Sequence, residues 1–296
     1  MIKRVPISIL ALVLSIATLA KTITLYFSNT VSNIFLIVAL IFLLLLILKV
    51  ILYRKQIIEE TNLVVIPLLT LLPMALTALN SFFIEKSPQI TSIVWYVSLI
   101  LVILTNIFYI KKIIIDKNFK MILPSTFVNF VGIDVLVVNR VPSASDELLL
   151  IILYYSIASY IISLIAVIYC IYKYKNFSNI TIPLMAIFAA PSALITVASI
   201  SSGLILNELY LKILLGMNIL GLIVYLIAFC KTSFKNFVPT LGAFTFPIVI
   251  NAVAFRLLNM KLQLNLDDIA RFYYYFAIAI VILISYKYCK HIFIKK

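Results

Sequence analysis

The sequence contains little charge, one histidine and few cysteines, and each shortage excludes a class of protein. Of its 296 residues, 11% are charged and 65% are hydrophobic, whereas soluble domains average about 25% charged and about 45–50% apolar residues. This composition excludes a soluble enzyme, a disordered protein and a nucleic-acid binder, although the net charge is +14. The single histidine and the three cysteines show no metal-ligand or disulfide spacing, so we expect no metal and no cofactor.

What the sequence does have is long apolar runs separated by short polar breaks. A helix that spans a bilayer needs about 20 apolar residues. The runs are continuous and show no alternation, which favours helices over a β-barrel. We therefore predict an all-α polytopic membrane protein, with ten transmembrane helices in a single domain over residues 1–296. The predicted spans are approximately 6–27, 31–53, 63–83, 90–110, 121–140, 147–172, 181–201, 205–229, 237–257 and 267–289.

The basic residues alternate between the two predicted sides of the membrane. An even number of spans places both termini on one side, and 17 of the 24 Lys and Arg residues fall on that side, against 7 elsewhere. Lys and Arg concentrate in cytoplasmic loops. The pattern accounts for the net charge and predicts a multi-pass protein of the plasma membrane with both termini in the cytoplasm.

The prolines follow a repeat. Eight of the ten lie in odd-numbered spans, and none lies in an even-numbered span. Those that open a span recur at intervals of 61, 57, 59 and 56 residues, and they are Pro6, Pro67, Pro124, Pro183 and Pro239. A second set follows six to eight residues later, and it consists of Pro73, Pro191 and Pro247, with Gly132 in the third repeat. A proline inside a helix removes a backbone hydrogen bond and kinks the helix.

This repeat predicts five tandem helical hairpins, approximately 1–57, 58–114, 115–177, 178–233 and 234–296. Kinked helices are tolerated in a membrane where they are buried in protein or line a wet cavity. We therefore expect the odd-numbered helices to face inward around a narrow channel, and the aliphatic even-numbered helices to face lipid. The alternative is that the kinks serve only the packing of the bundle.

Four strings in the odd-numbered spans resemble a known transporter family. They are 5-VPISILALVLSIATLAK-21, 123-LPSTFVNFVGI-133, 188-FAAPSALITV-197 and 244-FTFPIVINAVA-254. Together they resemble the tellurite-resistance/dicarboxylate transporter (TDT) family, which includes bacterial TehA and the plant slow anion channels. The resemblance implies five hairpins in quasi-fivefold order, an anion pathway lined by the inner helices, and a homotrimer with one pore per subunit. It also implies a phenylalanine of the ninth helix that plugs the pore.

Two aromatic residues in span nine are candidates for this pore gate. Phe244 and Phe246 lie two positions apart, so their side chains point about 160° apart around a helix and only one can face the axis. Phe246 directly precedes Pro247 at the centre of the span. We therefore predict that Phe246 is the gate. The alternative is that both rings belong to the core.

Polar groups inside the spans are further candidates. Lys21 and Asp134 lie at similar depth in spans one and five, and ionisable groups at such depth are by default functional. They either form a structural bridge, or Lys21 attracts anions at the outer vestibule, or Lys21 extends to the membrane surface. An unpaired Asp134 would suit proton-coupled transport. The amide of Asn251 either faces an anion or ties two helices together.

These features predict a membrane channel or transporter for small anions, and not an enzyme, because the spans lack the acidic or histidine clusters of a catalytic site. The alternative function is a proton-coupled secondary transporter or exporter of C4-dicarboxylates, tellurite or sulfite. No pair of intramembrane arginines is present, which favours small monovalent anions over dicarboxylates. An integral-membrane lipid enzyme and a scaffold without transport fit the sequence less well.

Overall fold

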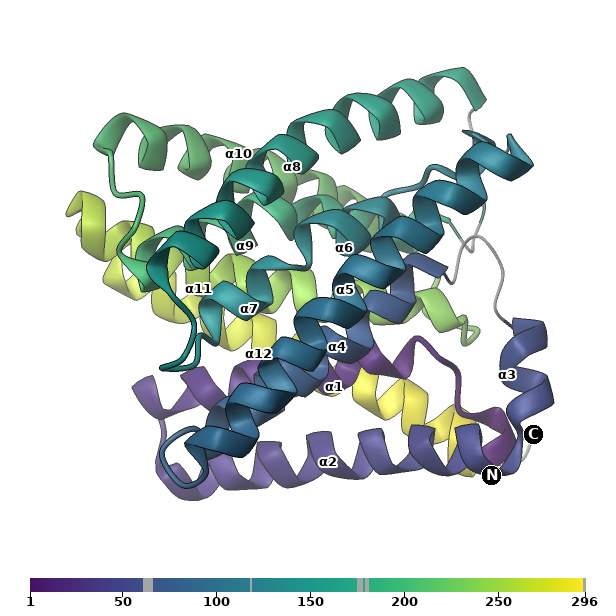
Figure 1. Ribbon diagram of the computed structural model, residues 1–296. Helices are drawn as coiled ribbons and strands as arrows, with labels where there is room; N and C mark the ends of the chain where they lie inside the picture. The colour runs from purple at the N-terminus through teal and green to yellow at the C-terminus, as the bar shows by residue number, and fades with distance from the viewer. Residues whose placement is uncertain (61–65, 118, 175–177, 179–180, 295–296) are drawn as a thin grey trace.

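The computed structural model describes residues 1–60, 66–117, 119–174, 178 and 181–294. Within these ranges the chain is helical and contains no β-strand, which confirms the predicted all-α class (Figure 1). The long helices are α2 Asn29–Leu52, α5 Pro88–Asp116, α8 Asp146–Tyr174, α10 Glu208–Lys231 and α12 Asp267–Phe293. The shorter α-helices are α1 Ile9–Thr22, α3 Arg54–Glu60, α4 Leu71–Asn80, α6 Ser125–Val131, α7 Asp134–Val138, α9 Pro191–Ser202 and α11 Phe246–Leu262. The 3-10 helices are η1 Ile2–Arg4, η2 Ile23–Leu25, η3 Ile66–Thr70, η4 Ser81–Phe83, η5 Phe119–Met121, η6 Ile182–Ala189 and η7 Pro239–Phe244.

The helices match the predicted spans closely. In the described part of the chain, 8 helices are long and apolar enough to cross a membrane, and Ile9–Leu25 is a shorter apolar helix. The predicted span 121–140 divides into α6 and α7. The predicted start of a span at residue 63 and the predicted hairpin boundary at residue 177 lie outside the described residues. The protein is therefore a multi-pass membrane protein, and the count of ten spans stays a prediction.

Burial separates the segments into two classes. In the most apolar stretch of Ile66–Phe83, Ile182–Ser202 and Pro239–Leu262, 67%, 83% and 72% of the residues are buried. In α2, α5, α8, α10 and α12 this share is only 28–33%. The proline-containing segments are therefore the inner ones, and the aliphatic helices form the outer layer with exposed apolar side chains.

The inner segments contact one another in a closed series. Helix α1 contacts both α4 and α11, and α9 contacts both α11 and α7. The series closes because α4 contacts α7. Each outer helix packs against the inner segment that precedes it, with α2 on α1, α5 on α4, α8 on α6, α10 on η6 and α12 on α11. This pairing is what tandem hairpins would produce.

Three inner segments change helix type halfway along. They begin as the 3-10 helices η3, η6 and η7 and continue as the α-helices α4, α9 and α11. The second proline of each segment lies at this change, because Pro191 opens α9 and Pro73 and Pro247 lie in the first turns of α4 and α11. Backbone N–H groups in the first turn of an α-helix have no partner within the helix, so a proline is tolerated there.

Side chains from other helices satisfy carbonyl groups at these changes of helix type. The Tyr225 hydroxyl donates to the Phe244 carbonyl at 2.9 Å. The Asn251 amide donates to the Ala189 carbonyl, also at 2.9 Å. Buried backbone groups are costly when left without a partner, above all where no water is present. The interrupted helices are therefore stabilised by hydrogen bonds from α10 and α11.

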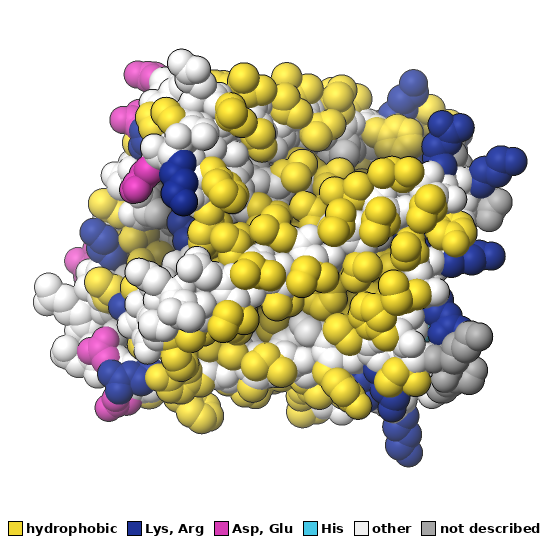
Figure 2. Space-filling view, turned by 90° about the horizontal axis from the view of Figure 1, so that it is seen from below, with side chains coloured by type: hydrophobic (Ala, Val, Ile, Leu, Met, Phe, Trp, Pro, Cys, Tyr) yellow, Lys and Arg dark blue, Asp and Glu magenta, His cyan; other side chains and the backbone are white. Residues whose placement is uncertain are grey.

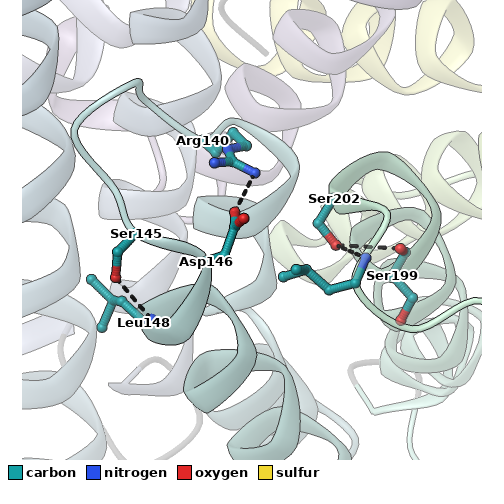
Figure 3. A network of polar contacts seen from close by, with 7 residues as sticks. Arg140, Ser145, Asp146, Leu148, Ser199 and Ser202 are labelled. Atoms are coloured by element: carbon teal, nitrogen blue, oxygen red, sulfur yellow. Dashed lines mark hydrogen bonds and ion pairs between the residues drawn. The ribbon is translucent and has the colours of Figure 1, made fainter.

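The two ends of the molecule differ in charge. Figure 2 shows Lys and Arg side chains at one end, Asp and Glu side chains interspersed with further Lys and Arg side chains at the other, acidic end, and a broad hydrophobic band between them. At the acidic end, Arg140 and Asp146 form an ion pair of 2.9 Å between the end of α7 and the start of α8 (Figure 3). In the same region the Ser202 hydroxyl donates to the Ser199 carbonyl at 3.2 Å. These contacts stabilise the connection between α7 and α8 and the last turn of α9.

Candidate functional site

A cavity of about 50 Å³ lies between the inner segments. The residues that line it come from all five odd-numbered predicted spans, and they are Ser8, Ala11, Leu68, Leu71, Met74, Phe127, Val128, Val131, Gly132, Leu184, Ile187, Ala190, Pro191, Leu194, Pro239, Thr240, Gly242, Ala243, Phe246 and Pro247. The described lining is almost entirely apolar and contains no ionisable side chain.

Helix type explains which side chains reach the cavity. A 3-10 helix has three residues per turn, so residues three apart lie on the same face. Three columns with this spacing line the cavity, and they are Leu68, Leu71 and Met74, then Leu184, Ile187 and Ala190, then Thr240, Ala243 and Phe246. Each column starts in a 3-10 helix and ends at or after the change to an α-helix.

The two phenylalanines of α11 and η7 point in different directions. Phe246 lines the cavity and is 6% exposed. Phe244 is fully buried, and its ring meets the rings of Tyr225 and Phe229 edge to face, with centroids 5.5 Å apart in both cases. Only Phe246 therefore borders the cavity, and its role as a gate stays a prediction.

Three of the four predicted kink residues lie on the cavity wall. Gly132, Pro191 and Pro247 line it, whereas Pro73 is buried within α4. A Cβ atom on Gly132 would collide with the Val128 carbonyl oxygen and would lie 2.6 Å from the Met74 sulfur. A side chain at position 132 would therefore require a shift of the backbone at the break between α6 and α7, and a different position of the Met74 side chain.

Four α-helices begin at the cavity. The N-terminal ends of α1, α4, α9 and α11 each contribute lining residues, among them Ala11, Leu71, Pro191 and Phe246. The N-terminal end of a helix carries a partial positive charge of roughly half an elementary charge. Such ends favour anions without any basic side chain. Three of these helices, α4, α9 and α11, continue the 3-10 helices η3, η6 and η7, whose carbonyl ends carry the opposite partial charge to the same place. The cavity is therefore apolar in composition and bordered by backbone dipoles of both signs.

The comparison with protein families decides the identity of the chain. The profile of the family described as voltage-dependent anion channel (SLAC1) matches residues 4–289. The chain belongs to the voltage-dependent anion channel family. A comparison with curated proteins gave no significant match. Membership confirms the family resemblance of the four strings and the prediction of a membrane anion channel or transporter that is not an enzyme.

Lys21 and Asp134 do not pair with each other in this member of the voltage-dependent anion channel family. The Lys21 ammonium donates to the Asn139 side-chain oxygen at 2.9 Å. Asp134 is fully buried, and its Oδ2 atom accepts a hydrogen bond of 2.5 Å from the Ser156 hydroxyl. The Oδ1 atom of Asp134 is buried without a partner among the described residues. The structure thus gives each predicted charge a neutral partner, and neither residue lines the cavity.

Asn251 is fully engaged between helices. Its amide nitrogen donates to the carbonyls of Ala189 and Asn218, and its side-chain oxygen accepts a hydrogen bond from the Tyr273 hydroxyl at 3.0 Å. The residue is 2% exposed and does not line the cavity. Of the two interpretations offered by the sequence, the geometry matches a tie between helices.

The sequence did not single out two polar residues that line the cavity. The Thr240 hydroxyl is buried without a hydrogen-bond partner in the described part of the chain. The Ser8 hydroxyl lies 2.8 Å from the Tyr288 hydroxyl. Thr240 directly follows Pro239 and Ser8 lies two residues after Pro6, so their position after an opening proline was the available signal.

Among the described residues, no group of three or more His, Cys, Asp or Glu side chains is placed to hold a metal ion.

Proposed function

We propose that the chain conducts small anions through the central cavity, which the inner segments line and which Phe246 plugs. The observation that carries this proposal is the position of Phe246 in the wall of a narrow cavity to which all five odd-numbered predicted spans contribute. A cavity this small and apolar holds no continuous file of hydrated ions. Hydrophobic constrictions of this kind close a pore by excluding water.

Anion preference arises in this proposal from the backbone. In this proposal the N-terminal ends of α1, α4, α9 and α11, which meet at the cavity, outweigh the carbonyl ends of η3, η6 and η7 and supply a positive potential. An anion that enters a widened cavity therefore meets favourable dipoles, while the absence of a fixed basic side chain among the described lining residues keeps it from binding too tightly. Conduction requires such a balance between entry and release.

Opening requires the Phe246 ring to leave the cavity. Phe246 and Pro247 form the first turn of α11, directly after the 3-10 helix η7. A change of helix type at this point would rotate the ring, because successive residues turn by about 100° in an α-helix and about 120° in a 3-10 helix. The break at Phe246 is thus the hinge of the proposed gate.

The finer organisation belongs to the same proposal. The closed series of inner contacts supports five tandem hairpins in quasi-fivefold order and ten spans. The basic end of the molecule lies at the side where Figure 1 marks both termini, which supports a plasma-membrane protein with both termini in the cytoplasm (Figures 1 and 2). The homotrimer is proposed from family resemblance. The exposed apolar side chains of the outer helices provide a surface on which subunits could pack.

A coupled transporter of dicarboxylates, tellurite or sulfite is the second candidate. The observation in its favour is the buried Asp134 carboxyl group, whose Oδ1 atom has no partner among the described residues. A carboxyl group in such a place is a candidate proton carrier. Its position outside the cavity lining makes it the weaker proposal.

The experiment that tests the channel is current through bilayers that contain the purified protein, under a chloride gradient. Wild type, Phe246→Ala and Phe244→Ala are compared, with thermal melting as a check that each variant is folded. We expect Phe246→Ala to raise the current and Phe244→Ala to leave it unchanged, with a reversal potential close to that of chloride. Equal currents in all three would remove Phe246 as the gate, and silence in all three would favour proton-coupled flux.

A further inference from the structure

A second pocket, with a volume of about 360 Å³, lies at the basic end of the molecule. Its walls come from the N-terminal segment, from the connection that follows α10, and from the last turns of α12. The side chains that define its chemistry are Arg4, Lys235, Phe237, Lys287, Lys290 and His291. Ligand pockets in proteins measure about 300 Å³ and more, so this pocket has room for an organic or polyatomic anion.

The charge of this pocket is of one sign. The four basic side chains of Arg4, Lys235, Lys287 and Lys290 contribute positive charge. Among the described residues that line the pocket, none is Asp or Glu. Like charges that converge without a counter-ion repel one another, so the arrangement is stabilised when an anion binds between them.

The walls are held in place by contacts within the protein. The Lys287 ammonium donates to the Phe234 carbonyl at 2.7 Å, and the Arg4 guanidinium donates to the Ile294 carbonyl at 3.2 Å. The rings of Phe237 and His291 stack, with centroids 4.0 Å apart and planes 12° apart. Lysine has three donors and arginine has five, so both cations keep donors for a ligand. Two of the four cations, Lys287 and Arg4, are thus held by backbone carbonyls, and the exposed Lys235 and Lys290 complete the pocket.

The position of the pocket on α12 suits the level of lipid headgroups. Helix α12 has 27 residues, which corresponds to about 40 Å of helix, whereas the hydrocarbon core of a bilayer is about 30 Å thick. This surplus length allows the last turns of α12, which carry the polar side chains of Lys287, Lys290 and His291, to extend beyond the hydrocarbon. Basic pockets between helices at this depth bind phosphate-bearing headgroups.

We propose that this basic pocket binds a phosphate-bearing anion, supplied either by the headgroup of an anionic lipid or by a soluble phosphate compound. Several basic side chains surround one ligand, and charge-assisted hydrogen bonds to phosphate are among the stronger polar contacts in proteins. A chloride or nitrate ion would leave most of the pocket empty.

Phe237 and Tyr288 connect the pocket to the central cavity. The Phe237 ring meets the Tyr288 ring edge to face at a centroid distance of 5.0 Å. The Tyr288 hydroxyl lies 2.8 Å from the Ser8 hydroxyl and donates to the Pro239 carbonyl at 2.6 Å. Both Ser8 and Pro239 line the central cavity. A ligand that touches Phe237 is therefore linked through Tyr288 to the wall of the proposed pathway.

The test measures binding to the purified protein in detergent, so it does not depend on ion flux. One arm titrates inorganic pyrophosphate and records thermal stabilisation, which rises with ligand concentration above Kd. The other arm titrates phosphatidic acid, with phosphatidylcholine for comparison, and counts bound lipids by native mass spectrometry. The pocket variant is Lys235→Gln with Lys290→Gln. The matched control is Lys111→Gln with Lys173→Gln, which removes the same charge from exposed positions outside the pocket.

We expect the pocket variant to weaken binding by at least about tenfold, because each lost contact is a hydrogen bond between charged groups. The control variant should bind like the wild type. Binding of phosphatidic acid alone identifies a lipid headgroup as the ligand, and binding of pyrophosphate in solution identifies a soluble phosphate. Equal weakening in both variants would reveal diffuse surface charge and overturn the proposal, as would the absence of binding in both arms.

Discussion

The Tyr225 hydroxyl donates a hydrogen bond of 2.9 Å to the Phe244 carbonyl, and the two rings meet at 90° with centroids 5.5 Å apart. This pair joins the outer helix α10 to the inner segment at the point where η7 ends. One tyrosine thus fixes both the backbone of the interruption and the direction in which the Phe244 ring points.

Removal of the Tyr225 hydroxyl should destabilise the protein. Tyr225→Phe keeps the ring but leaves the Phe244 carbonyl buried without this donor, which costs about 1–3 kcal/mol of the free energy of unfolding. Thermal melting in detergent measures the effect. Tyr286→Phe is the control, because Tyr286 is 58% exposed. Equal melting temperatures for Tyr225→Phe and the wild type would show that the carbonyl finds another partner.

Truncation of the two phenylalanines should affect stability unequally. Phe244→Ala removes a ring that packs on Tyr225, Phe229 and Phe234 and leaves a new void, at a cost of about 3–5 kcal/mol. Phe246→Ala only enlarges a space that already exists, so its loss should be clearly smaller. Denaturation of both variants in detergent measures the difference. The reverse order would mean that Phe246 is the main core residue.

Asp134 should tolerate loss of its charge. Asp134→Asn keeps the shape of the side chain and the contact with Ser156 while it removes a charge that burial penalises. We expect a melting temperature equal to or above that of the wild type. Asp134→Leu, which gives up the hydrogen bond, serves as the comparison. A marked loss of stability in Asp134→Asn would reveal a cationic partner that this structure does not place beside it.

Asn251 should matter for stability and not for anion selectivity. Asn251→Ala leaves two buried carbonyls and the Tyr273 hydroxyl without this hydrogen-bond partner. We therefore expect the free energy of unfolding to fall by at least about 2 kcal/mol. Tyr273→Phe removes only one of these bonds and should cost less. Melting measures the first effect and reversal potentials measure the second. A changed selectivity in folded Asn251→Ala protein would instead place this amide in the pathway.

Lys21 should couple to Asn139 and not to Asp134. The Lys21 ammonium contacts the Asn139 oxygen, so a double-mutant cycle of Lys21→Ala with Asn139→Ala should give an interaction energy of about 0.5 kcal/mol or more. The cycle with Asp134→Ala should be additive, because Asp134 bonds to Ser156. Non-additivity in the second cycle would restore the predicted bridge between the two charges.

The sequence alone predicted the span positions and the inner location of the proline-containing segments. Both follow from hydropathy and from the backbone chemistry of proline, which are local properties. The 3-10 character of η6 could not be predicted in this way, because it depends on packing against α10. There a Cβ atom on Gly221 would lie 2.9 Å from the Ala189 Cα atom, so the outer helix approaches the inner backbone directly.

The hydrogen-bond partners of single polar residues could not be predicted from the sequence either. Lys21, Asp134 and Asn251 were correctly singled out as polar groups at depth, but their partners Asn139, Ser156 and Tyr273 lie far away in the chain. The short helix α3, Arg54–Glu60, was missed because it is too polar to resemble a span. Conversely, the three-residue spacing of the cavity-lining side chains was present in the sequence, but it has meaning only once the 3-10 helices are known.

The 3-10 parts of the three interrupted inner segments are longer than α-helices with the same number of residues. A 3-10 helix rises about 2.0 Å per residue and an α-helix about 1.5 Å. The 8 residues of η6 are therefore stretched by about 4 Å relative to the same residues in an α-helix. Winding such a segment into an α-helix would draw one of its ends inward and turn its column of side chains away from the axis. Each of these three segments is thus longer than an α-helix of the same residues, and hydrogen bonds from Asn251 and Tyr225 hold the ends of η6 and η7 in this form.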